Sequence, residues 1–301
     1  MNRISRILCP VDFFPASERA VSFAAGLAES YDAELKLLHI VPSFVSPFYE
    51  LPVNSASVTA GLEEGSRRRF DRLIRKLKLT GVNVTIDVQS GDISDRIDKA
   101  IQTYKPDLVA MGTHGRRGAK RWIVGSITER LLRRSPVPVL AISSSWKRRT
   151  DPRPRRILVT TDFSKGTAAA LEYAFSIAKE NHARVTLLNV LEENRALISV
   201  DYRKRLARSV QHKLVKLVPE DARPWCETRV EAGTPYHVIL GMVKKDKFDL
   251  VVMNIHGISM LDRALLGTTA ERVLRAAECP ILLIPPTRKV ARRAGPKLRA
   301  A

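Results

Sequence analysis

The chain has 301 residues, with 51 lysines and arginines against 31 aspartates and glutamates, which gives a formal net charge of +20 at pH 7. A hydrophobic content of 45% suits a globular protein, the length suits two domains of about 150 residues, and no run of about 18 apolar residues indicates a membrane span. The charge favours anionic partners such as nucleotides, nucleic acid or acidic lipid surfaces, without selecting among them.

Predicted strands and helices alternate along the first half. Apolar runs predict strands at residues 6–11, 34–41, 82–89, 107–111 and 137–142, and helical spacing of apolar residues predicts helices at 17–31, 59–79, 92–104 and 126–134. Strands joined by helices in this way require a parallel sheet with right-handed crossovers. We therefore predict a doubly wound α/β fold. Ligands bind such sheets beyond the carboxyl ends of the strands, where Asp12 and Gly112 fall.

The second half repeats the first. Asp12-Phe13 recurs 150 residues later as Asp162-Phe163, whereas Asp107-Leu-Val recurs 142 residues later from Asp249. The difference falls within residues 41–58, whose prolines and serines predict a surface loop. The chain is therefore a tandem duplication of five-stranded domains. We place the domains at 1–143 and 155–285, a basic linker at 144–154, and a basic disordered tail at 286–301.

The most informative motif is Gly112, two residues, Gly115, nine residues, and Gly125-Ser126. It follows a predicted strand and opens a predicted helix. Glycines let the backbone approach a ligand closely, and free N–H groups at a helix start bind anions, so the motif predicts a phosphate site. The loop within it has four basic residues and no acid: Arg116, Arg117, Lys120 and Arg121. The alternatives are turn glycines, a solvated basic loop and a helix N-cap at Ser126.

A weakened copy of the motif lies in the second half. It consists of Asn254, Gly257, Gly267 and Thr268. Asn254 replaces the first glycine, Ala270 replaces the hydroxyl of Thr128, and the loop at 258–266 is formally neutral. Because each change lowers the expected affinity for phosphate, we predict nucleotide binding in the first domain and weak or no binding in the second.

Together these residues resemble the universal stress protein family, as a tandem two-domain member. The resemblance covers nearly the whole chain apart from the linker and tail. It implies an adenine-nucleotide-binding, Rossmann-like fold and ATP as the ligand, accompanied by a divalent ion such as Mg²⁺. The family's ATP-binding residues map onto Asp12, Ile40, Met111, Gly112, Gly115, Gly125, Ser126 and Thr128. The second, weaker site maps onto Asp162, Val190, Asn254, Gly257, Gly267 and Thr268.

Two carboxylates keep an alternative role. Asp12 can accept from an adenine amino group or a ribose hydroxyl, or it can cap the following helix, for which Ser17 is also available. Asp162 has the same alternatives, with Ser164 as the other cap.

In the family, the last strands of two domains pair antiparallel. Here residues 136–142 and 280–284 can pair within one chain, and a further homodimer is left open.

Neither metal nor redox chemistry is indicated. Cys9, Cys226 and Cys279 lie far apart and form no CxxC pair, so we expect reduced structural thiols in a cytoplasmic protein without a signal peptide. His114 and His256 recur beside the loop glycines, but neither has a partner at metal-ligand spacing, so we expect no zinc site.

The predicted function is nucleotide-dependent regulation in a stress response. ATP would order the 112–125 loop and change a partner-binding or dimer surface. We expect no enzyme beyond slow incidental ATP hydrolysis, because the P-loop and nucleophile-elbow motifs are absent from the sequence. The alternative is an interaction module whose basic linker, tail and helix face at 67–69 hold nucleic acid or an acidic protein. An enzyme acting on adenylated substrates rests on the fold alone.

Overall fold

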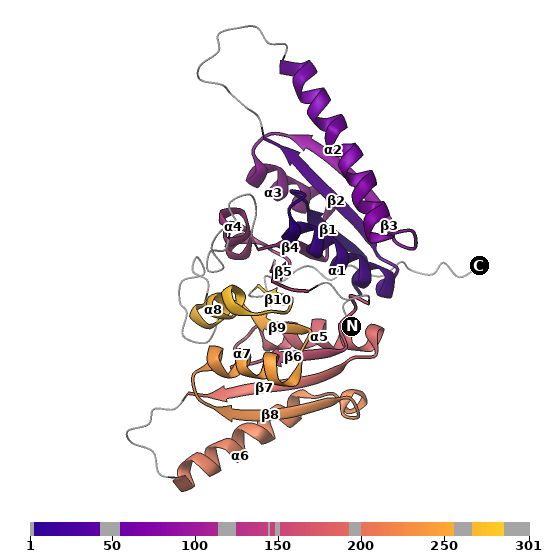
Figure 1. The fold of residues 1–301 in the computed structure, drawn as a ribbon. Helices are drawn as coiled ribbons and strands as arrows, with labels where there is room; N and C mark the ends of the chain where they lie inside the picture. Colours follow the sequence, from indigo (N-terminus) through magenta and orange to yellow (C-terminus); the bar gives the residue numbers. More distant parts are fainter. Residues whose placement is uncertain are drawn as a thin grey trace, which may run out of the picture.

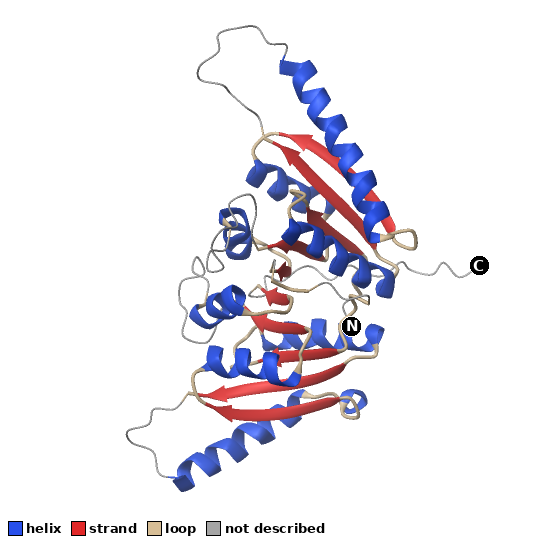
Figure 2. Cartoon of the chain, viewed as in Figure 1, coloured by secondary structure: helices blue, strands red, loops and turns tan. Residues whose placement is uncertain are grey.

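A computed structural model describes residues 3–42, 55–113, 125–143, 145–147, 151–192, 200–255 and 267–285. These residues form two similar α/β halves that share one ten-stranded sheet (Figure 1). Helices cover both faces of the sheet in each half (Figure 2). The predicted fold class, two tandem doubly wound halves with parallel strands, is confirmed.

The first half follows the predicted order of elements. They are β1 (Arg6–Pro10), α1 (Pro15–Tyr31), β2 (Glu34–Val41), α2 (Ser55–Leu77), β3 (Asn83–Ser90), α3 (Ile93–Tyr104), β4 (Leu108–Gly112), α4 (Ser126–Arg134) and β5 (Val139–Ile142). The boundaries have local causes: Asp92 caps α3 by accepting from the Asp95 N–H at 3.0 Å, and Pro138, which has no N–H to donate, delays the start of β5. The helix predicted from residue 59 begins four residues earlier, at Ser55.

The second half repeats this order. Its elements are β6 (Arg156–Thr160), α5 (Thr167–Asn181), β7 (Arg184–Leu191), α6 (Val200–Leu217), the short 3-10 helix η1 (Glu220–Ala222), β8 (Cys226–Ala232), α7 (Pro235–Asp246), β9 (Leu250–Asn254), α8 (Thr268–Ala276) and β10 (Ile281–Ile284). Equivalent helices end alike, because α1 and α5 both stop at a left-handed residue, Asp32 and His182, each with a φ of 51°.

The sheet order is β3-β2-β1-β4-β5-β10-β9-β6-β7-β8. Pairing is parallel within each half, and β5 and β10 meet antiparallel at the centre, where Leu140 faces Leu282. Within each half the direction of strand succession reverses between the first and fourth strands. The carboxyl ends of β1 and β4, and of β6 and β9, therefore form the edges at which doubly wound proteins bind ligands.

The core lies on both faces of the sheet, as expected for buried parallel strands. Along β1, Ile7 and Cys9 face α1 and α2, whereas Leu8 faces α3 and α4. The α2 face contributes Phe70, which is fully buried. No described helix combines the length and the apolar character needed to cross a membrane.

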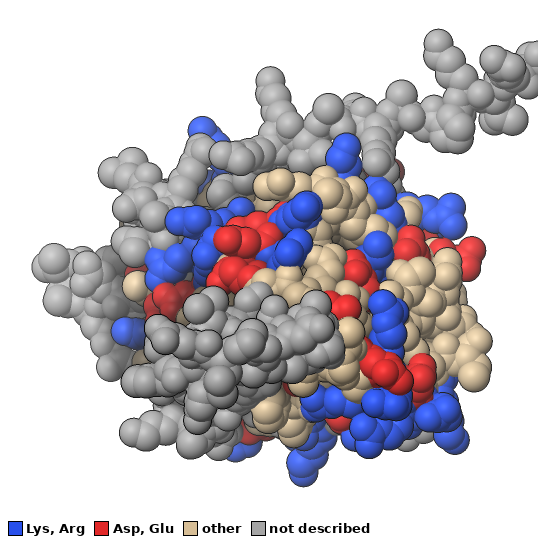
Figure 3. Space-filling view, turned by 90° about the horizontal axis from the view of Figure 1, so that it is seen from above, with Lys and Arg blue, Asp and Glu red and all other residues tan. Residues whose placement is uncertain are grey.

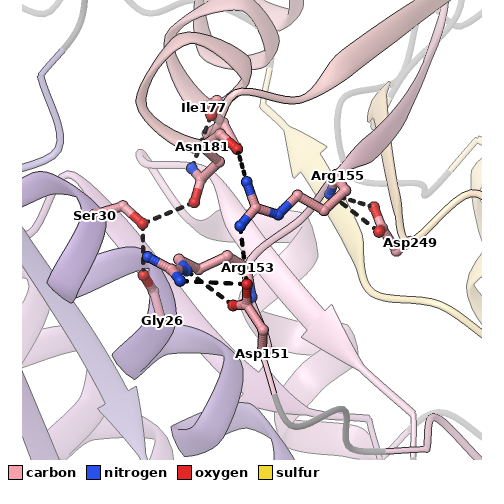
Figure 4. Close-up of polar contacts among 8 residues, drawn as sticks. All are labelled: Gly26, Ser30, Asp151, Arg153, Arg155, Ile177, Asn181 and Asp249. Carbon is pink, nitrogen blue, oxygen red and sulfur yellow. Dashed lines mark hydrogen bonds and ion pairs between the residues drawn. The ribbon is translucent and has the colours of Figure 1, made fainter.

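Polar contacts join the two halves beside the linker (Figure 4). Ser30 Oγ in α1 lies 2.7 Å from Asn181 Oδ1 in α5 and 2.8 Å from the carbonyl oxygen of Gly26. Nearby, Tyr31 Oη lies 2.8 Å from Ser176 Oγ. The equivalent helices α1 and α5 of the two halves therefore contact each other through side chains in their carboxyl-terminal portions.

Candidate functional site

The carboxyl ends of β1 and β4 form the candidate site in the first half. The segment after β4 returns to its starting point, because the Gly125 N–H donates to the Thr113 carbonyl at 2.8 Å and the Thr113 N–H donates to Ile142 at 2.9 Å. The second half has the same bonds, from Gly267 to Ile255 at 3.0 Å and from Ile255 to Ile284 at 3.0 Å. Both halves thus bring the start of their fourth helix to the end of their fourth strand.

Asp12 shapes the turn between β1 and α1. Its Oδ1 accepts from the Phe14 N–H at 3.0 Å and from Ser17 Oγ at 2.6 Å. These bonds form a local side-chain turn ahead of the helix rather than a cap on the helical N–H groups. Among the described residues, none forms a hydrogen bond with Asp12 Oδ2.

Phe13 belongs to this edge, although the sequence prediction did not include it. Its backbone is left-handed, with a φ of 62°, and the equivalent Phe163 has the same value. The Phe13 ring packs 4.7 Å from the His39 ring and 4.8 Å from Phe70, while Arg69 lies 4.2 Å from its centroid. The recurrence of Asp-Phe in both halves was the available signal.

Contacts within the protein account for two of the predicted residues. A Cβ on Gly112 would lie 2.7 Å from the carbonyl carbon of Ala16 and 2.8 Å from the Ser17 nitrogen, so only glycine fits where α1 presses on β4. Thr128 is buried, and its hydroxyl donates to the Gly112 carbonyl at 3.1 Å. The fold therefore requires glycine at position 112, and the Thr128 hydroxyl is engaged within the protein.

Gly125 and Ser126 differ from this pair. A Cβ on Gly125 would meet only the Thr113 oxygen at 3.5 Å and Thr128 Oγ1 at 3.8 Å, and its φ of −61° suits any residue. Nothing among the described residues requires glycine there. Ser126 is exposed at the first position of α4, and no described residue bonds its hydroxyl. As in any α-helix, the first N–H groups of α4 lack intrahelical acceptors, and Gly125 provides no side-chain cap for them.

The remaining predicted residues of the first half divide into two groups. Ile40 and Met111, at the ends of β2 and β4, are buried in the core on the α3–α4 face. Gly115 lies outside the described residues, as do His114 and the basic loop residues of the motif.

In the second half, the Asn254 side chain lies against Gly166, where the first half has Gly112 against Ala16. A Cβ on Gly166 would lie 2.8 Å from Asn254 Oδ1. With its amide nitrogen facing the Gly166 carbonyl at 3.1 Å, Asn254 accepts from Ser164 Oγ at 3.0 Å and from the Thr167 N–H at 3.3 Å. The side chain therefore ties the end of β9 to the start of α5.

The other predicted residues of the second half differ less from their first-half counterparts. Asp162 Oδ1 accepts from the Ser164 N–H at 3.0 Å, as Asp12 accepts from Phe14. Thr167, the equivalent of Ser17, bonds the Thr161 hydroxyl at 2.8 Å instead of the aspartate. Val190 is half-buried at the end of β7. Gly257 and His256 lie outside the described residues.

Thr268 is exposed at the first position of α8. It opens, with Thr269, onto a pocket of about 630 Å³ beside the start of α7. Arg272 covers the Tyr236 ring on this wall at 4.6 Å. Gly267 precedes α8 as Gly125 precedes α4, and neither has a side-chain cap. The helix start of the second half is thus intact, and the change lies at Asn254.

The cysteines are inert in this environment. Burial raises the pKa of the Cys279 thiol to about 12 and that of Cys226 to about 12, and it raises the pKa of Cys9 well above its usual range. Thiols with such pKa values stay protonated near neutral pH and are poor nucleophiles. All three are free, and Cys9 and Cys279 pack in the core.

The fold and this edge define a class: tandem doubly wound α/β proteins with an aspartate after the first strand and a glycine-led helix after the fourth. The sequence pattern of the universal stress protein family matches the chain twice, over residues 3–143 and 154–285. The chain belongs to the universal stress protein family.

Individual relatives match over most of the chain or over one half. A universal stress protein of Mycolicibacterium smegmatis is 23% identical over 297 residues, which cover 93% of this chain and 97% of that protein. One of Methanocaldococcus jannaschii is 28% identical over 148 residues, covering 48% of this chain and 86% of its own. The crystal structure of a universal stress protein from Archaeoglobus fulgidus has a TM-score of 0.69 at 21% identity, covering 94% of this chain and 98% of that one. At this level of sequence identity, the structural similarity shows a common fold.

Proposed function

We propose that this stress protein binds ATP at the carboxyl ends of β1 and β4 and acts by nucleotide-dependent regulation rather than by catalysis. The observation that carries the proposal is Gly125 followed by Ser126. Among the described residues, nothing in the packing requires the glycine, and none bonds the hydroxyl of the serine, which stands at a helix start without a side-chain cap. Both features suit a phosphate group that approaches the backbone closely.

Each predicted residue has a role in this arrangement. Ser126 Oγ and the first N–H groups of α4 would hold phosphate oxygens, with the helix dipole favouring the negative charge. Asp12 Oδ2 would accept from the adenine amino group or a ribose hydroxyl, since Oδ1 is engaged by Ser17. Ile40 and Met111 would form the apolar floor. A bound Mg²⁺ would neutralise charge on the phosphates.

The two halves are proposed to differ in affinity. Asn254 supports this asymmetry, because its amide fills the edge and bonds Ser164 and Thr167 at the start of α5. A nucleotide in the second half would have to displace these bonds. Thr268 and Gly267 keep the helix start, so weak phosphate binding there remains part of the proposal.

Regulation would arise because ATP binds one arrangement of the edge more tightly than another. A nucleotide that bridges Asp12 and Ser126 links the β1–α1 turn to α4. The turn continues into α1, whose far end contacts α5 of the other half through Ser30 and Asn181. We further propose that the antiparallel pairing of β5 with β10 lets the two halves act as one unit in the cytoplasm.

The basic interaction module is the less supported alternative. Two arginines at the end of the linker segment and the start of the second half are already engaged, since Arg153 and Arg155 donate to Asp151 at 2.8 Å and 3.0 Å. Basic and acidic side chains are interspersed on the face in Figure 3. Both observations reduce the charge that these surfaces offer to nucleic acid.

Mass spectrometry of small molecules released from freshly purified, denatured protein tests the proposal directly. We expect about one ATP or ADP per chain, and a stabilisation on adding ATP and Mg²⁺ to emptied protein. Two nucleotides per chain would contradict the asymmetry. No nucleotide, together with no thermal shift on adding ATP and Mg²⁺, would overturn ATP binding itself.

A further inference from the structure

The amino-terminal end of the second half's sheet has an arginine pair that the fold does not explain. Arg156 begins β6 and Arg184 begins β7, and the two residues are register partners. Adjacent strands lie about 4.8 Å apart, and like charges on directly paired residues destabilise a sheet. At the equivalent position of the first half, Arg6 pairs with Glu34, so the charges there are opposite.

Neighbouring carboxylates do not neutralise this pair. Among the described residues, neither Arg156 nor Arg184 has an acidic partner. Glu227, an acid on the same wall, is engaged by Arg229 at 2.8 Å and by Thr186 Oγ1 at 2.7 Å. Arg229 in turn also binds Asp246 at 2.9 Å. Among the described residues, no ion pair therefore neutralises the charge of Arg156 or Arg184.

In both halves an aromatic ring lies beside the first-strand arginine, Tyr104 at 5.5 Å from Arg6 and Phe248 at 5.6 Å from Arg156, but the residue at the end of the third helix differs. In the first half, Tyr104 at the end of α3 lies over this end of the sheet, where its hydroxyl donates to the Glu34 carbonyl at 3.3 Å and Lys36 lies 4.4 Å from its ring. Its equivalent at the end of α7 is Asp246, which turns to Arg229.

The pocket beside Arg156 and Arg184 has a volume of about 420 Å³, a size typical of small-molecule sites. Its wall includes Arg156, Arg184, Arg223, Trp225, Glu227 and Phe248. Phe248 is buried with Arg156 above its ring at 5.6 Å, and Trp225 packs against Phe175 at 5.6 Å. Arg223 adds a third exposed cation, whose pairing with Glu220 is 3.6 Å long and exposed on both sides.

The backbone of the pair is fixed. Asp249 accepts from the Arg155 N–H at 3.0 Å (Figure 4) and from the Arg156 N–H at 2.9 Å, which holds the start of β6. The pocket lies at the amino-terminal ends of β6, β7 and β8, whereas the proposed nucleotide site lies at the carboxyl ends of β1 and β4 in the first half.

We propose that this pocket binds a small molecule carrying a phosphate or pyrophosphate group. Arg156, Arg184 and Arg223 would contact the phosphate oxygens, since guanidinium groups bind phosphate in two-point geometry. Trp225 and Phe248 would contact the organic part of the ligand. The anion would replace the carboxylate that Glu34 supplies in the first half.

Inorganic pyrophosphate is the probe, and the indole N–H signal of Trp225, assigned with Trp225→Phe, is the readout. The titration uses full-length protein carrying Gly125→Asp, which removes the proposed nucleotide site as a competing phosphate site. We expect a saturable shift of the Trp225 signal. No shift, or a shift that does not saturate, would overturn the proposal.

Two charge-reversing variants separate a built site from general attraction. Arg184→Glu recreates the opposite-charge pair of the first half, so we expect it to keep the fold and weaken pyrophosphate binding at least about tenfold. Arg205→Glu changes the net charge equally on the exposed face of α6, and we expect the affinity to stay within about twofold. Equal losses in both variants would overturn the site.

A short DNA duplex tests the other source of phosphate. Under the proposal, the duplex produces no saturable shift of the Trp225 signal. A saturable shift with the duplex and none with pyrophosphate would replace the small-molecule proposal by nucleic-acid binding.

Discussion

Asn254 closes over Gly166, and the pair reverses the sizes found at the same place in the first half. There the helix contributes Ala16 and the strand contributes Gly112, whose Cβ would lie 2.8 Å from that of Ala16. In the second half the helix has the glycine, and the strand has the larger residue. The exchange keeps each helix close to its strand, but it moves the side chain onto the edge proposed to bind nucleotide.

The exchange predicts strong coupling between positions 16 and 112. Gly112→Asn alone should destabilise the protein by about 2–4 kcal/mol, because the new side chain overlaps the backbone of α1. Adding Ala16→Gly should recover at least about half of that loss by making the room that Gly166 makes. Urea unfolding of the two single variants and the double variant measures the coupling. Additive effects would contradict the proposed compensation.

Gly125 should be dispensable for stability and important for ligand binding. Gly125→Ala should change the free energy of unfolding by less than about 1 kcal/mol, since its Cβ meets only ordinary contacts. Gly125→Asp should lower ATP affinity at least about tenfold, because it brings a carboxylate to the phosphates. Gly267→Asp is the matched control in the second half, with little expected effect on ATP. Isothermal titration of all three variants decides, and full affinity in Gly125→Asp would argue against the site.

Thr128 offers a test of which hydroxyls face the ligand. Thr128→Val removes the bond to the Gly112 carbonyl while keeping the shape, so we expect a loss of about 1–2 kcal/mol in stability. Since this hydroxyl is buried and bonded within the protein, ATP affinity should fall less than in Ser126→Ala, whose hydroxyl is exposed. Calorimetry on both variants gives the comparison. A larger loss of affinity for Thr128→Val would place its hydroxyl, and not that of Ser126, on the phosphates.

The sequence was sufficient for the elements that depend on local patterns. Apolar periodicity predicted β2 and α4 with the bounds that the structure has, and the position of Gly125-Ser126 at a helix start followed from the same pattern. The alignment of the repeats also identified Asn254 as a replacement for glycine. These features are readable because each depends on residues close together in the chain.

Contacts between distant residues were not predictable in the same way. The partner of Asn254 is Gly166, and the acceptor of the Thr128 hydroxyl is Gly112, neither of which follows from local periodicity. The packing of the Phe13 ring against His39 and Phe70 likewise joins residues that are far apart in the sequence. The role of Gly115 and the basic loop stays a prediction, since these residues lie outside the described part of the chain.

Asp151 should make stability depend on pH in the acid range. Hydrogen bonds from Arg153 lower the pKa of Asp151 to about 2, below the usual carboxyl value of about 3.9, so folding favours the ionised form. Its contribution is fully present above pH of about 4 and is lost as the pH falls toward about 2. Because the pair is substantially exposed, the contribution should be below about 1 kcal/mol.

The comparison of wild type with Asp151→Asn measures this contribution. The wild type should have the higher melting temperature at pH 5 to 7, roughly the range in which the carboxylate is ionised in both states, and the difference should close near pH of about 2. Asp201→Asn is the matched control, since Asp201 is exposed in the first turn of α6 and lies away from the linker. A melting-temperature difference for Asp151→Asn that stays constant from pH 7 to 2 would show that the side chain stabilises the linker through its shape and neutral hydrogen bonds, and not through its charge.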